Sequence, residues 1–135
     1  MKAVCSGAGE WLATNDRGAI VKVGTSETAE AFTPGELLQL ASALCAALSA
    51  EARLDHALTD PALSLTVRPS RVEAENRYSQ IDTVVRTDLS GLDAEQLEHL
   101  RLRIDAAIDR SCTVGRTLHA GATTTFRLES NDEVR

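Results

Sequence analysis

The feature that most constrains the fold is a long apolar segment that begins near residue 33. Thr33-Pro34-Gly35-Glu36 is a typical helix start. Thr33 can cap the first turn, Pro34 suits the first helical position, and Glu36 completes a Thr-x-x-Glu capping box. Leucine and alanine then recur on almost every side until about Ala57. The pattern predicts a helix from Pro34 to about Ala57 that is buried on most sides, because an apolar surface all round has to be covered.

Runs of β-branched residues flank this helix. We predict strands over residues 10–14 and 19–24, joined by the turn Asn15-Asp16-Arg17-Gly18 and followed by a polar loop over residues 25–32. After the helix, residues 63–75 and 78–88 read as two further strands with a tight turn between them, and residues 122–128 as a final strand.

A second helix is indicated between the later strands. Asp93 can cap it, with Gln96 as the partner in its capping box, and the helix stops near Arg110. Its apolar residues form one narrow stripe, so half of it is expected to face solvent; they are Leu97, Leu100, Ile104 and Ile108. An extended segment is expected after this helix, and a frayed tail over residues 131–135.

The element order predicts one domain, residues 1–135, of the α+β class, with helices packed on antiparallel sheet. The chain has only four aromatic rings, so leucine, valine, isoleucine and alanine have to build the core. Small side chains bury little area each, which makes contact between subunits attractive as a further source of stability.

Charge and sequence pattern exclude several classes of function. A net charge of −6 argues against nucleic acid, since phosphate binding requires a basic surface. No apolar run is expected to reach the roughly 20 residues that span a bilayer, and the N-terminus lacks the apolar region of a signal peptide. We therefore expect a cytoplasmic protein, in which three cysteines are inert or redox-active rather than joined in structural disulfides.

The residues alone leave the role of the cysteines open. Cys45 lies on an apolar helix face, where a cysteine is more often a space-filling group than a nucleophile. Cys112 follows the end of the second helix, whose partial negative charge disfavours a thiolate and suits a resolving role. Cys5, near the N-terminus, is expected to be incidental. Neither a Cys-x-x-Cys pair nor clustered histidines occur, so no metal site is expected.

Two motifs resemble those of one family. The run Pro34-Gly35-Glu36-Leu37-Leu38, continued to Cys45, resembles the Pro-Glu-Glu-Leu-Leu…Cys helix of OsmC/Ohr proteins (osmotically inducible protein C and organic hydroperoxide resistance protein). The run Ser111-Cys112-Thr113-Val114 resembles their second cysteine motif, typically Cys-Pro-Val-Ser. The resemblance covers about residues 10–128. It implies the OsmC-like fold, with antiparallel sheets packed on a central buried helix, in an intertwined homodimer whose active sites lie at the interface.

The resemblance also implies thiol peroxidase chemistry. Cys45 is then the peroxidatic cysteine, which attacks an organic hydroperoxide and becomes a sulfenic acid. Cys112 is the resolving cysteine, which forms a disulfide with it, and an external dithiol restores both thiols. Neither a metal nor an organic cofactor is implied.

The chain departs from the family pattern beside the peroxidatic cysteine. Family peroxidases use a Glu ten residues before that cysteine and an Arg that lowers its pKa. Gly35 holds the Glu position here, with Glu36 one residue further on, and Arg17 and Arg116 are the candidate cations. Thr113 stands in place of the proline. The rival prediction is a non-catalytic dimer that binds a small apolar ligand or acts as a slow thiol sensor.

Overall fold

The computed structural model describes residues 1–130, so the predicted frayed tail lies outside the described residues. A three-stranded antiparallel sheet comes first, in the order β1-β2-β3. Helix α1, the antiparallel hairpin β4–β5, helix α2 and a short helix α3 follow. Their bounds are Lys2–Gly7 (β1), Glu10–Thr14 (β2), Ile20–Gly24 (β3), Pro34–Ala57 (α1), Ser64–Val72 (β4), Arg77–Arg86 (β5), Ala94–Ser111 (α2) and Thr113–Ala120 (α3). The predicted α+β class is confirmed.

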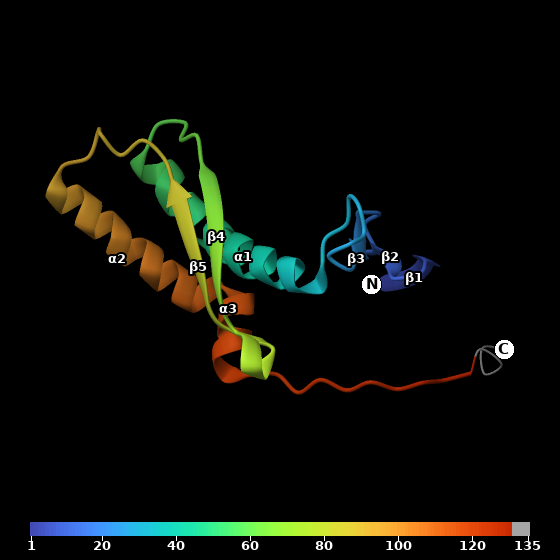
Figure 1. Ribbon diagram of the computed structural model, residues 1–135. Helices are drawn as coiled ribbons and strands as arrows, with labels where there is room; N and C mark the ends of the chain where they lie inside the picture. The colour runs from blue at the N-terminus through green and yellow to red at the C-terminus, as the bar shows by residue number, and fades with distance from the viewer. Residues whose placement is uncertain (131–135) are drawn as a thin grey trace.

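The body of the molecule consists of α1 packed against α2 and against the β4–β5 hairpin. Figure 1 shows the β1–β3 sheet beyond the N-terminal end of α1, apart from this body, and residues 121–130 running away from it. The hydrophobic core lies between the two long helices and is centred on Ala50, Leu54 and Leu100.

Both long helices begin where their capping residues predict. The Glu36 N–H donates to Thr33 Oγ1 (3.2 Å), and the Thr33 N–H donates to the Glu36 carboxylate (2.7 Å). At α2 the same reciprocal pair joins Asp93 and Gln96 (2.8 and 2.9 Å). Each box satisfies two N–H groups that a helix start leaves unpaired.

Helix α1 is less covered within this chain than its apolar pattern predicts. Only Ala43, Ala50 and Leu54 are buried on it, whereas Leu44 is 45% and Leu48 69% exposed. The expectation that no apolar run is long enough for a bilayer was wrong as well. By length and composition alone α1 could cross a membrane, because its 24 residues include an 18-residue stretch with a mean hydropathy of 1.3; core helices of soluble proteins pass the same test.

Three local predictions were wrong. The first strand was expected at residue 10, but the residues before it form strand β1, which contains Cys5 and pairs with β2. The segment after Cys112 is helix α3 and not extended chain. Residues 122–128 do not form a strand, because none of the strands within residues 1–130 lies beside them to complete the hydrogen-bond ladder.

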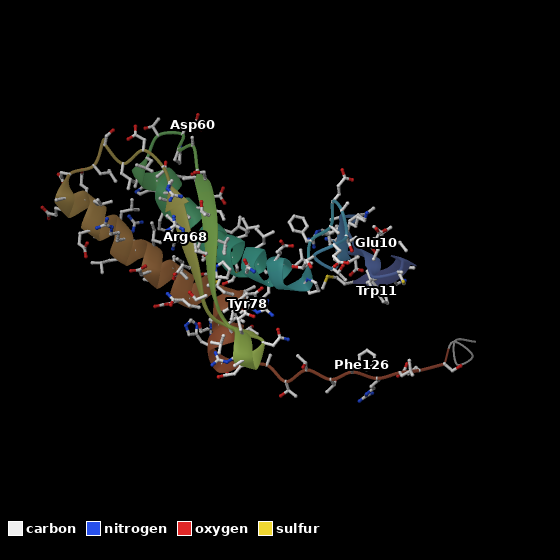
Figure 2. The ribbon with its side chains drawn as sticks, viewed as in Figure 1. Glu10, Trp11, Asp60, Arg68, Tyr78 and Phe126 are labelled. Carbon is white, nitrogen blue, oxygen red and sulfur yellow. The ribbon has the colours of Figure 1, made fainter. Side chains whose placement is uncertain are left out.

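The chain exposes far more surface than a compact monomer of its size. A compact monomer of 14.5 kDa exposes about 6,900 Å², whereas this chain exposes 10680 Å². Part of the excess lies on the apolar face of α1, and part on residues 121–130, where Phe126 is 91% and Leu128 92% exposed. Figure 2 shows the Phe126 side chain apart from the rest of the molecule. Exposed apolar surface beyond that of an ordinary monomer is typical of sites that contact another molecule.

Candidate active site

Two of the three cysteines meet where the three helices come together. Cys45 lies in the middle of α1 and is half-buried, while Cys112 is buried at the joint between α2 and α3. The Cys112 N–H donates to Ile108 O (2.8 Å) and so ends α2. The Cys112 Sγ accepts the Gly115 N–H (3.3 Å) and so begins α3. One residue therefore terminates one helix and caps the next.

This double role corrects the predicted electrostatics of Cys112. From the sequence, Cys112 was expected to lie beside the partial negative charge at the end of α2 alone. The start of α3, with partial positive charge, lies at the same residue. Gly115 makes the close approach possible, since a Cβ at that position would lie only 3.1 Å from Cys112 Sγ.

The Cys45 thiol faces hydrogen-bond donors that favour its ionised form. The pKa of Cys45 is lowered, chiefly by the backbone N–H of Val114 and then by the Cys112 thiol, with a smaller contribution from the N–H of Thr113. Partial burial opposes this shift but does not reverse it. The first N–H groups of a helix have no partner inside the helix, so those of Thr113 and Val114 in α3 can stabilise a thiolate.

The Cys112 thiol is shifted the opposite way. Its pKa is raised, first by burial and also by its interaction with Cys45, against the lowering effect of the Gly115 N–H. The two thiols titrate as a pair, in which Cys45 ionises first and Cys112 keeps its proton and donates it to the thiolate.

The other predicted site residues lie elsewhere in the described chain. Glu36 is engaged in the capping box of α1. Arg17 lies in the β2–β3 turn, in the sheet beyond the start of α1, and Arg116 on α3 donates to Arg110 O (3.2 Å). Neither arginine is among the groups that shift the pKa of Cys45. A role for either one beside Cys45 stays a prediction.

A cavity of about 1180 Å³ extends from the first turn of α1 along β5 to α3. Ser42, one helical turn before Cys45, and Gly115, three residues after Cys112, are among its lining residues. The Tyr78 phenol on β5 also lines it and accepts a hydrogen bond from Gln39 Nε2 (2.9 Å). Neither this phenol nor the N–H donors of α3 were predicted from the sequence. The one available signal for the donors was Thr113, which has a backbone N–H where the family motif has a proline without one.

Sequence relatives of this chain occur in mycobacteria. It is 36% identical over 128 residues to the uncharacterized protein Rv2923c of Mycobacterium tuberculosis and to Mb2948c of Mycobacterium bovis, covering 94% of this chain and 92% of each relative. No family model matches the chain.

Solved structures share its fold. An OsmC-like protein from Mycoplasma pneumoniae superposes with a TM-score of 0.60 at 16% identity, covering 87% of this chain and 84% of that one. A Psychrobacter arcticus protein, described as a candidate osmotic stress induced and detoxification response protein, gives 0.65 at 18% identity, covering 86% and 85%. A candidate redox protein from Lactobacillus casei gives 0.52 at 21% identity, covering 87% and 81%.

The chain therefore has the fold of OsmC-like proteins, as the resemblance implies. By sequence the chain belongs to one family with the mycobacterial proteins Rv2923c and Mb2948c.

Proposed function

We propose that the protein is a thiol peroxidase that reduces organic hydroperoxides through Cys45 and Cys112. The observation that carries the proposal is the set of donors around Cys45, namely the Val114 and Thr113 N–H groups and the Cys112 thiol. They supply the thiolate stabilisation that an arginine supplies in family peroxidases. The OsmC-like fold and the redox description of one structural neighbour support the same class of chemistry.

The reaction follows from the unequal thiols. The Cys45 thiolate attacks the terminal oxygen of ROOH, the O–O bond breaks, and the alkoxide takes a proton and leaves as ROH. Cys45 is then a sulfenic acid without negative charge, which removes one cause of the raised Cys112 pKa. Cys112 loses its proton, attacks the Cys45 sulfur and expels water, and an external dithiol reduces the resulting disulfide.

We also propose that the functional unit is a homodimer. Each chain exposes more surface than a compact monomer, and two chains could each bury half of this excess against the other. The total area buried in the contact would then fall in the range of about 2,000–5,000 Å² that is typical of obligate dimers. The exposed leucines of α1 are the apolar surface that such a contact would cover.

A thiol count tests the proposed function directly. One equivalent of cumene hydroperoxide should remove two of the three thiols per chain, with Cys5 as the thiol that survives. The unfolded protein is titrated with a thiol reagent before and after the peroxide. In Cys5→Ser the count should fall from two to none. A count that does not change would refute the peroxidase and favour the ligand-binding dimer.

Thr113→Pro should remove one N–H donor from the N-terminus of α3 and so reveal its effect on Cys45. Proline suits the first position of a helix, and Cys112 before it is already extended (ψ 92°), so α3 should persist without the N–H of residue 113. The pKa of Cys45 should rise, and its reaction with peroxide at pH 7 should slow between about two- and tenfold.

Thr113→Ala is the matched control, because it removes the side chain and keeps the N–H. The rate of alkylation by iodoacetamide is measured against pH, with the modified Cys45 peptide quantified by mass spectrometry. Its midpoint should shift upward in Thr113→Pro only. Equal midpoints in Thr113→Pro and Thr113→Ala would show that this N–H does not stabilise the thiolate.

A further inference from the structure

The first turn of α1 carries a contact that only glycine permits. A Cβ at residue 35 would lie 2.5 Å from the Tyr78 hydroxyl, closer than a Cβ approaches any atom in a relaxed structure. Gly35 is also the position at which family peroxidases carry their Glu. The Tyr78 phenol therefore occupies space that a side chain at position 35 would fill.

The Tyr78 hydroxyl has a proton available for a ligand. Gln39 Nε2 donates to its oxygen (2.9 Å), so the phenol acts as acceptor in that contact and its own O–H is left to donate. Gly35, Gln39 and Tyr78 all line the 1180 Å³ cavity, into which the O–H can point.

The two α1 residues beside the phenol, Gln39 and Gly35, lie at fixed spacings before Cys45 on the helix. Gln39 precedes Cys45 by six residues, which is about 9 Å along a helix axis, and Gly35 precedes it by ten residues, or about 15 Å. Apolar side chains of three elements line the cavity: Leu38 of α1, Ile81 of β5 and Leu118 of α3. Ser42, one helical turn before Cys45, is the lining residue of α1 that comes closest to Cys45 in the sequence.

We propose that Tyr78 is a specificity-determining residue, whose phenol holds a hydrogen-bond acceptor at the far end of the substrate while the peroxide group meets Cys45. The inference rests on the proposed peroxidase function. The preferred substrates are hydroperoxides with an apolar chain of about 9–15 Å that ends in an acceptor such as a carboxylate, rather than pure hydrocarbon peroxides.

Two matched peroxides test the proposal: ω-hydroperoxydecanoate, which ends in a carboxylate, and n-decyl hydroperoxide, which ends in a methyl group. Tyr78→Phe removes only the hydroxyl and should raise KM for the first peroxide about tenfold, with kcat and the second peroxide unaffected. Gly35→Ala should have the same selective effect, because its Cβ displaces the phenol without removing it.

Thr83→Val is the control, since it removes a hydroxyl from the same strand at a residue that lines a different cavity. It should leave the KM of both peroxides unchanged. Equal effects of Tyr78→Phe on the two peroxides, or no effect on either, would overturn the proposal.

A binding measurement separates this proposal from the peroxidase itself. In Cys45→Ser, which has no peroxidatic thiol, calorimetry with decanoate should show binding that weakens about tenfold when Tyr78→Phe is added. If wild type consumes no peroxide but this dependence holds, the peroxidase is refuted and the acceptor site at Tyr78 stands. If decanoate binding does not depend on Tyr78, the acceptor site is refuted whatever Cys45 does.

Discussion

Cys45→Ser should abolish peroxide consumption, whereas Cys112→Ser should still complete one turnover. The expected asymmetry follows from the donors: Cys45 receives the N–H groups of α3, while Cys112 is buried and keeps its proton. Without Cys112, no thiol stands beside the Cys45 sulfenic acid to condense with it.

Dimedone, which reacts with sulfenic acids, gives the readout. After one equivalent of cumene hydroperoxide, Cys112→Ser should carry a dimedone adduct on Cys45 in the majority of chains, and wild type should carry almost none. Cys5→Ser is the control, and it should behave as wild type does. An adduct on Cys112 in the Cys45→Ser protein would show that the two roles are reversed.

Cys112→Ser should also react more slowly in that single turnover. The Cys112 thiol is the second of the groups that lower the Cys45 pKa. A serine hydroxyl has a shorter bond to Cβ and donates less well to the Cys45 sulfur from that position, so the pKa of Cys45 should rise. The pH dependence has a fixed sign, because only the thiolate attacks. The rate in both proteins should fall as pH falls through the lowered pKa of Cys45.

Leu44→Glu combined with Leu48→Glu should destroy the assembly. These leucines lie one helical turn apart on α1 and are exposed within one chain, so charge there would be buried unpaired in a dimer. Wild type should elute and scatter light at about twice 14.5 kDa, and the double variant should aggregate or unfold.

Leu102→Glu is the matched control for that variant. Leu102 is 60% exposed, comparable with Leu48 at 69%, but lies on α2 and outside the proposed contact. It should remain dimeric with unchanged thermal stability. A folded wild-type monomer at micromolar concentration would refute the dimer. A double variant indistinguishable from wild type would show that these leucines of α1 do not lie in the contact between subunits.

The elements with local signals could be predicted from the sequence. The capping boxes at Thr33 and Asp93 fixed the starts of the two long helices, because both partners of each box lie within three residues. Helix α3 has no such signal: Thr113, Val114 and Gly115 are poor helix formers. Its start depends on the Cys112 sulfur as a cap and on packing against α1, which is a tertiary contact.

The candidate site was predictable only in part for the same reason. The family resemblance predicted that Cys45 and Cys112 lie close together, although 67 positions separate them in the sequence. The donors that activate Cys45 are backbone N–H groups, which every residue except proline carries and which leave no mark in a sequence. The Tyr78 phenol was equally hidden, since its place beside Gly35 depends on how β5 packs against α1.

The position of Cys112 at the joint of two helices links the redox state of the protein to its resistance to unfolding. A disulfide from this joint to the middle of α1 closes a loop of 67 residues, and restricting the unfolded chain in this way is worth about 4 kcal/mol. Folding and disulfide formation are linked in a thermodynamic cycle. The equilibrium constant for forming the disulfide must therefore be roughly a thousandfold larger in the folded chain than in the unfolded chain. The oxidised protein is then the more heat-resistant form, and the external dithiol has to work against the stability of the whole fold.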